Sequence, residues 1–353
     1  MSALLDILDL TTGEIDALMD TADDIAARPA AYAERCRGKK LATLFFEPST
    51  RTRLSFEAAM YELGGNVLGF SDPAGSSVSK GETTADTARV VGCYADIIAM
   101  RHPLEGAPAA AALFAGVPVI NAGDGGHNHP TQTLADLLTI RREHGRLNGL
   151  TIGLCGDLKY GRTVHSLARA MARYPGSRFI FLSPEELRMP DYVKSDLHAA
   201  GVEFEETANL ESALPRLDVL YMTRIQKERF DNPEQYEQLK NSYILTEEKM
   251  KYGGANLRVL HPLPRVNEIA PEVDADTRAC YFEQVICGKQ MRMALILKLL
   301  AEPAQVPAPL PEHDGLRCRN PRCISVQERG LFPRVTQKSG AYRCWYCESE
   351  AKD

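Results

Sequence analysis

Hydroxyl and guanidinium groups are concentrated in one short run, Phe45-Phe46-Glu47-Pro48-Ser49-Thr50-Arg51-Thr52-Arg53, which follows an apolar segment. Because the run opens a helix-like stretch, its backbone N–H groups and the positive end of the helix would favour an anion. Ser49, Thr50 and Thr52 add hydroxyl donors, and Arg51 adds a forked cation that matches phosphate oxygens. The alternative is a helix N-cap beside a solvated arginine. The whole run favours a phosphate-binding cradle.

Three further segments carry groups of the same kind. Arg101 directly follows an apolar run, and His129 and Gln132 stand at the start of a helix-like stretch. A polar loop, 76–82, carries Lys80 near its tip. Taken singly, His129 is equally explained as a structural histidine and Lys80 as a solvated lysine. Together these side chains supply the charge and the donors that a doubly charged phosphate beside a carbonyl group requires.

A second group of cations lies in the later part of the chain. Arg162 stands in a glycine-containing turn, and Arg224 with Gln226 follows another apolar run. Two arginines at strand ends fit a ligand with two carboxylates, whereas either one alone is equally explained by a structural ion pair. In the run 261–265, prolines stiffen the chain, so Leu263 and Pro264 are expected to present backbone carbonyl groups.

Four of the nine cysteines crowd the last part of the chain. Cys318 and Cys323 are separated by four residues, and Cys344 and Cys347 by two. Two such pairs about twenty residues apart suit a closed tetrahedral zinc site with a structural role. Two disulfides are the alternative, which a reducing compartment disfavours. The remaining cysteines are expected to be small buried hydrophobes: Cys36, Cys93, Cys155, Cys280 and Cys287.

The elements that must position these groups alternate between strand-like and helix-like patterns, which predicts an α/β fold. Strands are predicted at 41–46, 96–100, 117–121, 151–155, 178–182, 202–205, 218–221 and 258–260. Helices are predicted at 52–63, 131–144, 163–173 and 285–300. The pattern favours two doubly wound parallel-sheet domains with a site in the cleft between them, because ligands bind at the carboxyl ends of such strands.

The predicted domains are 1–140 for the phosphate-binding part, with helix 285–301 packing back on it, and 141–284 for the second ligand. A proline-rich linker is predicted at 302–311, and a small cysteine-bearing β domain at 312–353.

The 353 residues have a net charge of −6, with 44% hydrophobic and 25% charged residues. This balance is ordinary for a soluble protein and does not favour nucleic acid or an acidic membrane as partner. The first ten residues contain no basic residue, and no apolar run reaches the length of a membrane span, so a cytoplasmic location is expected.

The runs 46–53, 129–132, 224–226 and 261–264, together with Arg101 and Arg162, resemble in order the motif series of aspartate carbamoyltransferases. The resemblance covers residues 1 to 301 and implies two α/β domains and a catalytic homotrimer. Ser76 and Lys80 match a loop that reaches across from a neighbouring subunit.

The resemblance assigns three sets of residues. The carbamoyl phosphate set is Ser49, Thr50, Arg51, Thr52, Ser76, Lys80, Arg101, His129, Gln132, Leu263 and Pro264. The aspartate set is Lys80, Arg162, Arg224 and Gln226. The catalytic set is Arg51, Thr52, Lys80, Arg101 and His129.

Residues 312–353 resemble the zinc domain of the aspartate carbamoyltransferase regulatory chain, which implies a fusion of catalytic and regulatory pieces. The nucleotide-binding domain that precedes the zinc domain in that chain has no counterpart here. We expect the module to support assembly by pairing trimers. The alternative is a module that only caps its own subunit.

The implied reaction converts carbamoyl phosphate and L-aspartate to N-carbamoyl-L-aspartate and phosphate, the committed step of pyrimidine biosynthesis, without a catalytic cofactor. The first alternative is ornithine carbamoyltransferase, whose family usually has cysteine where Pro262 stands. Arg224 and Gln226 also suit a β-carboxylate better than an ammonium group. The alternative from another class is an inactive scaffold with a nucleic-acid-binding zinc ribbon, which the acidic balance disfavours.

Overall fold

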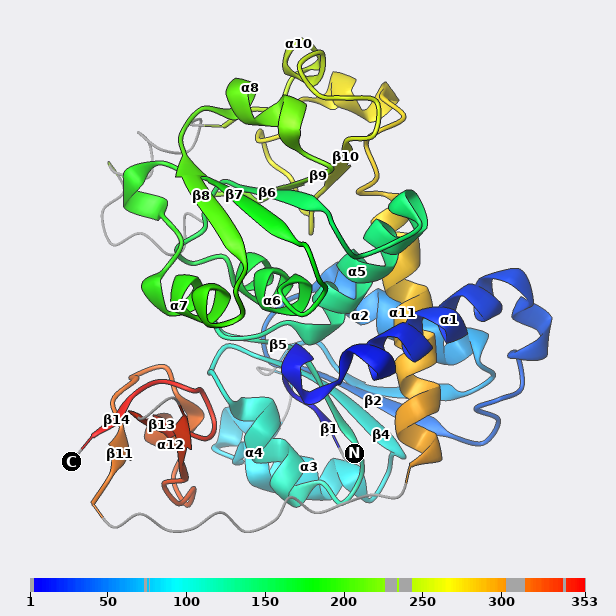
Figure 1. Cartoon of the computed structure of the whole chain (residues 1–353). Helices are drawn as coiled ribbons and strands as arrows, with labels where there is room; N and C mark the ends of the chain where they lie inside the picture. The colour runs from blue at the N-terminus through cyan, green and yellow to red at the C-terminus, as the bar shows by residue number, and fades with distance from the viewer. Residues whose placement is uncertain are drawn as a thin grey trace. The chain divides into compact units, whose positions relative to one another are not determined.

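The computed structural model describes residues 3–72, 75, 77–225, 234, 243–302, 315–338 and 341–352. The predictions on Ser76, Gln226 and residues 303–311 of the linker therefore lie outside the described residues. The chain forms two compact units, one of residues 1–131 with 289–353 and one of residues 132–288 (Figure 1).

The first unit is built on a parallel five-stranded sheet with the order β1-β5-β4-β2-β3. Its strands are β1 (Ala3–Leu4), β2 (Lys40–Phe45), β3 (Asn66–Phe70), β4 (Ile97–His102) and β5 (Val119–Asp124). Its helices are α1 (Thr12–Ala27), α2 (Thr50–Glu62), α3 (Thr84–Gly92), α4 (Ala107–Phe114) and the later part of α11 (Glu283–Ala301).

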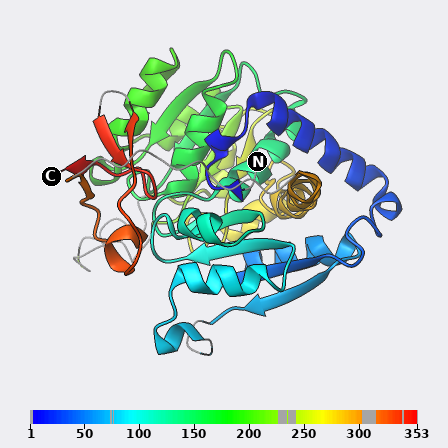
Figure 2. The same ribbon diagram turned by 90° about the horizontal axis from the view of Figure 1, so that it is seen from below.

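Both faces of this sheet are covered, which explains why its central strands are apolar at successive positions. On one face, Leu44 and Met100 pack with alanines of α3 and α4, and the two helices lie together (Figures 1 and 2). Leu41 and Ile97, which point to the opposite face, are also fully buried. The helices α1, α2 and α11 lie on that side, as Figure 1 shows.

The second unit contains another parallel sheet, with the order β10-β9-β6-β7-β8. Its strands are β6 (Thr151–Cys155), β7 (Arg178–Leu182), β8 (Glu203–Thr207), β9 (Val219–Met222) and β10 (Arg258–Leu260). The helices are α5 (Pro130–His144), α6 (Arg162–Met171), α7 (Asp191–Ala199), α8 (Leu210–Ala213) and α10 (Glu247–Met250). In Figure 1, α6 and α7 lie on one face of this sheet, and α8 and α10 lie on the other.

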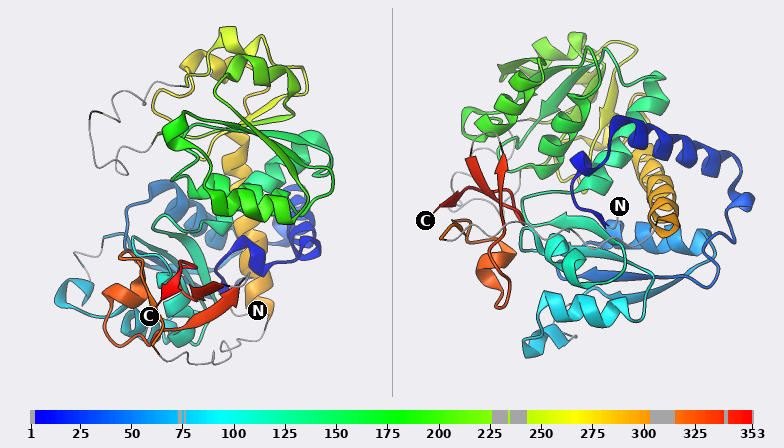
Figure 3. Two further views of the ribbon diagram at one scale, coloured as in Figure 1. Left: turned by 60° about the vertical axis from the view of Figure 1, so that its left-hand side comes forward. Right: turned by 60° about the horizontal axis from the view of Figure 1, so that its bottom comes forward.

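The C-terminal residues 315–352, which we call the zinc module after the metal that its cysteines are predicted to bind, form a small antiparallel structure within the first unit (Figure 3). Strand β11 (Arg317–Cys318) pairs with β14 (Ala351–Lys352), and β12 (Val335–Lys338) pairs with β13 (Ala341–Cys344). One short helix, α12 (Ile324–Gln327), follows the first cysteine pair. The predicted fold class, two parallel-sheet domains with a small β domain bearing four cysteines, is therefore confirmed.

Within the described residues, no helix combines the length and the apolar character that crossing a bilayer requires.

Candidate active site and metal centre

In the first unit, the predicted phosphate cradle grows from the ends of neighbouring strands. Strand β2 pairs with β4 so that Phe45 stands opposite Arg101, and the N–H of Phe46 donates to the Arg101 carbonyl at 2.8 Å. Because parallel strands end at the same edge of a sheet, the Ser49–Thr52 run and Arg101 emerge side by side. The strand order, which brings together segments about fifty residues apart, thus joins the first two predicted motifs.

The Ser49–Thr52 run forms the N-terminus of α2. Ser49 occupies the N-cap position, and its side chain makes no cap hydrogen bond to the helix. Arg51 is exposed in the first turn, and Thr52 is half-buried. The positive end of a 13-residue helix therefore lies at this edge of the sheet, and the three hydroxyl residues of the run lie at that end.

Arg101 is held mostly inside the unit, with 12% of its side chain exposed. One of its terminal nitrogens lies 3.2 Å from Glu47 Oε2, and the other donates to the Ala122 carbonyl at 3.5 Å. Glu47 belongs to the predicted run but was not assigned a role. Its carboxylate fixes the guanidinium group at the edge of the cradle.

His129 enters the same unit from the loop that follows β5, and it is buried. Its Nδ1 lies 3.5 Å from the Thr131 hydroxyl. The loop is held by Asp124, whose carboxylate accepts hydrogen bonds from the backbone N–H groups of Asn128 and Gly106 at 3.0 and 2.7 Å. Strand β5 lies beside β4, so the His129 loop begins next to the strand that carries Arg101.

Lys80 lies on a short 3-10 helix, Ser77–Lys80, and its side chain is exposed. The helix α3 begins four residues later. Its position on an exposed loop is compatible with the prediction that this lysine serves the active site of a neighbouring subunit, which stays a prediction.

In the second unit, the neighbouring strands β6 and β9 carry the two predicted aspartate arginines. The N–H of Thr223 donates to the Cys155 carbonyl at 2.8 Å, so the two strand ends lie in register. Gly156 has a φ of 118°, and a Cβ there would lie 2.3 Å from the Thr223 carbonyl oxygen. Only glycine allows this approach. Arg162 then opens α6, and Arg224 directly follows the Thr223 contact.

Gln132 belongs to the second unit by its contacts. Its side-chain amide donates to Asp136 Oδ1 at 2.7 Å, and the same oxygen accepts a hydrogen bond from Gln284 at 2.5 Å. Asp136 is fully buried. A buried carboxylate that the sequence did not single out therefore orients the Gln132 amide.

The loop after β10 carries Leu263 and Pro264 and is shaped by His261. The Leu263 N–H donates to His261 Nδ1 at 2.7 Å, and His261 Nε2 lies 2.8 Å from Glu268 Oε1. This pairing makes Nε2 the protonated nitrogen of a neutral ring. Burial raises the pKa of Glu268, but His261 and backbone N–H groups outweigh it and hold that pKa below its ordinary value.

The four cysteines of the zinc module gather in one cluster. Their sulfur atoms all lie within 4.8 Å of one another, with 3.5 Å between Cys318 and Cys347 and 3.8 Å between Cys323 and Cys344. These separations exclude disulfide bonds, whose sulfurs lie about 2 Å apart. Four thiolates around a tetrahedral ion, each about 2.3 Å from it, would lie about 3.8 Å apart. The donor set and its spacing therefore fit a four-coordinate metal ion.

The zinc module packs on α4 of its own chain. Ala109 and Ala110 of this helix share an apolar cluster with Ile324, Leu331 and Tyr346. Since α4 also covers the sheet, it is buried on two sides, which explains its nearly all-apolar sequence.

Backbone contacts join the module to the segment between β4 and α4. The Glu105 N–H donates to the Arg322 carbonyl, and the Ile324 N–H donates to the Glu105 carbonyl, both at 2.9 Å. Gly106, with a φ of 79°, lies against the module so closely that a Cβ would stand 2.5 Å from the Tyr346 carbonyl oxygen. The module is therefore seated on this segment through its main chain.

Three family models match consecutive parts of the chain. The carbamoyl-P binding domain of aspartate/ornithine carbamoyltransferase matches residues 3–142, and the Asp/Orn binding domain matches residues 148–299. The metal binding domain of the aspartate carbamoyltransferase regulatory chain matches residues 313–353.

Individual relatives agree with these models. An aspartate carbamoyltransferase catalytic subunit of Clostridium botulinum (strain Langeland) is 59% identical over 84% of this chain and 97% of its own length. That of Clostridium acetobutylicum is 58% identical over the same shares.

Solved structures give the same result. The catalytic subunit of M. jannaschii aspartate transcarbamoylase is 47% identical, with a TM-score of 0.80 over 85% of this chain and 98% of its own. Aspartate transcarbamoylase from Trypanosoma cruzi, in complex with carbamoyl phosphate and aspartate, is 37% identical, with a TM-score of 0.80 over 84% and 96%. The chain therefore belongs to the aspartate carbamoyltransferase family, and its C-terminus carries the metal binding domain otherwise found in the regulatory chain of that enzyme.

Proposed function

We propose that the protein is an aspartate carbamoyltransferase that transfers the carbamoyl group of carbamoyl phosphate to L-aspartate, the committed step of pyrimidine synthesis. One observation carries this conclusion: the predicted ligand residues emerge from adjacent strand ends in each unit, β2 with β4 and β6 with β9. Relatives that match 84% of this chain over 97% of their own length bear that enzyme's name, and the T. cruzi aspartate transcarbamoylase has been solved with carbamoyl phosphate and aspartate.

In the first unit, the α2 N-terminus and Arg51 would bind the phosphate group of carbamoyl phosphate. Arg101 and His129 would donate hydrogen bonds to the carbonyl oxygen, where negative charge develops when the aspartate amine attacks the carbon. The C–N bond forms as the C–O bond to phosphate breaks; phosphate leaves with the electron pair and takes up the proton that the amine loses. Glu47 would hold Arg101 until the substrate's own negative charge replaces that carboxylate as its partner.

In the second unit, Arg162 and Arg224 would each pair with one carboxylate of L-aspartate, and Gln226 would add a hydrogen bond. Ornithine carries an ammonium group in place of the second carboxylate, so the arginine assigned to that carboxylate would repel it. The test measures carbamoyl transfer to aspartate and to ornithine side by side. We expect turnover with aspartate; faster turnover with ornithine would overturn the specificity.

We propose that the cysteine cluster binds zinc, because four thiolates and no open position are typical of structural zinc. Metal analysis should find one zinc ion per chain, and Cys344→Ser should lower this number. Cys93→Ser is the matched control, since that thiol lies outside the cluster; it is exposed, so the prediction that Cys93 is buried was wrong. Another metal, or unchanged zinc in the Cys344 variant, would refute the assignment. Four reduced thiols also fit the expected cytoplasmic location.

We further propose that the catalytic unit is a homotrimer with shared sites, in which Lys80 serves a neighbouring subunit. The zinc module contacts α4 of its own chain, as the capping alternative requires. Because this contact lies within one chain, the pairing of two trimers through their modules is a separate proposal. Light scattering of the intact enzyme tests it, since a mass of three chains would favour capping and a mass of six would favour pairing.

A further inference from the structure

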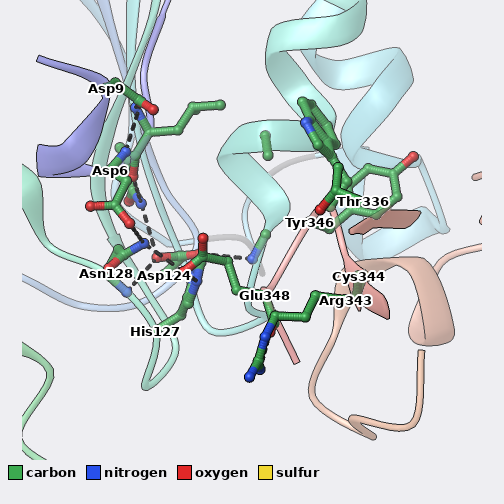
Figure 4. A pocket seen from close by; sticks show the side chains of 15 residues that line it. Asp6, Asp9, Asp124, His127, Asn128, Thr336, Arg343, Cys344, Tyr346 and Glu348 are labelled. Carbon is green, nitrogen blue, oxygen red and sulfur yellow. Dashed lines mark hydrogen bonds and ion pairs between the residues drawn. The ribbon is translucent and has the colours of Figure 1, made fainter. Parts of the chain in front are cut away.

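A pocket of about 230 Å³ with a polar wall lies between the zinc module and residues 3–131 of the same unit, which we call the body (Figure 4). On that wall, His127 stands between two carboxylates from different parts of the chain. Its Nδ1 lies 3.0 Å from Asp124 Oδ2, and its Nε2 lies 3.8 Å from Oε2 of Glu348 in the module. Only 16% of the His127 side chain is exposed, and 1% of Asp124. The imidazole therefore links the module to the body.

The body end of this link holds the loop that leads to His129. Besides His127, Asp124 accepts hydrogen bonds from the N–H groups of Asn128 and Gly106 and from the side chain of Asn121. Asn128 is the residue directly before His129, and its side chain also donates to Asp6 at 3.1 Å. A displacement of His127 would therefore disturb the carboxylate that fixes the backbone next to His129.

A second contact from the module reaches the same loop. The side chain of Asn320 donates to Glu105 Oε2 at 2.5 Å, and Glu105 Oε1 accepts from the Gly126 N–H at 3.4 Å. The loop 124–129 is thus approached from the module at two places, His127 and Gly126. Neither contact touches the residues that were assigned to substrate.

We propose that the zinc module positions the His129 loop through the chain Glu348–His127–Asp124, so that Glu348 and His127 are positioning residues for carbamoyl phosphate binding. This proposal rests on the proposed function of His129. It assigns the module a role in the chemistry of its own subunit, separate from any role in assembly.

The charges around His127 support this link. Burial disfavours the charged imidazole, but Asp124 and Glu348 outweigh it and raise the pKa of His127 well above its ordinary value of 6.5. The Nδ1 of a charged ring donates to Asp124 at 3.0 Å, while Nε2 faces the Glu348 carboxylate at 3.8 Å and the Asn128 amide nitrogen at 3.3 Å. The other charged groups on the pocket wall are Asp6, Asp9 and Arg343, and Arg343 donates to the Glu348 carbonyl at 3.1 Å.

The test is a double-mutant cycle on the full-length, zinc-loaded enzyme. Glu348 has a φ of 57°, so we choose Glu348→Gln, which keeps the side-chain length and removes the charge. Glu348→Gln and His127→Gln should each raise the KM for carbamoyl phosphate about threefold or more, and the double variant should show no further rise. The KM for aspartate at saturating carbamoyl phosphate should stay within about twofold. Glu350→Gln, in the same module but at an exposed carboxylate that pairs with Lys352, should change neither.

Hydrogen exchange provides a readout that does not depend on catalysis. Glu348→Gln should accelerate amide exchange in the segment 124–129, with zinc content and exchange in β6 and β7 unchanged. Unchanged exchange, an unchanged KM, or effects that simply add in the double variant would overturn the positioning role. If the wild-type enzyme transferred no carbamoyl group while the loop still loosened, the proposed function would fail and the link from module to loop would stand.

Discussion

The carboxylate of Glu328, in the zinc module, accepts a hydrogen bond of 2.9 Å from the backbone N–H of Thr84, the first residue of α3. The Ala85 N–H donates to the same carboxylate at 3.3 Å. A negative charge at a helix N-terminus is stabilising, so the module stabilises the helix that follows the Lys80 loop. We predict that Glu328→Gln destabilises the folded protein by about 0.5–2 kcal/mol.

Thermal unfolding of the zinc-loaded enzyme measures this loss. Glu350→Gln is the control, since Glu350 lies in the same module and 59% of its side chain is exposed. Equal melting temperatures for the Glu328 and Glu350 variants would contradict the prediction.

Replacing Arg51 by alanine should lower kcat about 100-fold or more, because a cation that meets the transferring group stabilises charge that develops in the transition state. The KM for aspartate should change much less, since aspartate is assigned to other arginines. Steady-state kinetics with both substrates varied separates the two effects. Arg37→Ala, at an arginine with 84% of its side chain exposed, is the control. A variant with near-normal turnover would remove Arg51 from the catalytic set.

Mixing two inactive variants should restore activity if sites are shared between subunits. Lys80→Ala damages the loop that is predicted to cross to a neighbour, and Arg51→Ala damages the cradle of the same chain. A hybrid trimer can contain a site with an intact cradle and an intact Lys80, so up to about one third of its sites recover. Activity is measured after subunit exchange, which mass spectrometry must demonstrate. Full exchange without recovery would mean that Lys80 serves its own chain.

Glu268→Gln should reduce stability in a pH-dependent way. The His261–Glu268 pair is buried, with 1% and 5% of the side chains exposed, so the loss near neutral pH should be about 1–3 kcal/mol. Because the pKa of Glu268 is lowered in the fold, its contribution is present above the ordinary value of 4.5 and is lost as pH falls through the lower folded value.

Urea unfolding at a series of pH values tests this linkage. The gap between the wild type and Glu268→Gln should be constant near neutral pH and should close below pH 4.5. A gap that stays constant down to strongly acidic pH would show that the carboxylate is not preferentially ionised in the folded state.

The sequence predicted best those elements whose ends are marked by turn residues. Strands β6, β7 and β10 begin and end where they were expected, because their apolar runs stand between polar and glycine residues. Helix α4 was not predicted, because it is buried against both the sheet and the module and therefore has no polar face to mark a helical period. Strand β1, with two residues, is too short to carry a pattern.

The residues of the candidate sites also include some that the sequence predicted and some that it did not. The four cysteines were expected together from their spacing, and the structure gathers them. Some of the supporting contacts could not be predicted, because the two partners are distant in the sequence. Glu105 and Asn320 are 215 residues apart, and Asp136 and Gln284 are 148 apart. Such pairs are created by the packing of elements, for which a single sequence carries no periodic signal.

Gly106 has a consequence for how this fused chain can change over generations. The Tyr346 carbonyl oxygen would stand only 2.5 Å from a first side-chain carbon, so even alanine at position 106 would force the module away from α4. Substitutions on the body and on the module at this contact must therefore remain compatible with each other. A transplanted metal domain would be accepted here only if its main chain passed position 106 at the same distance.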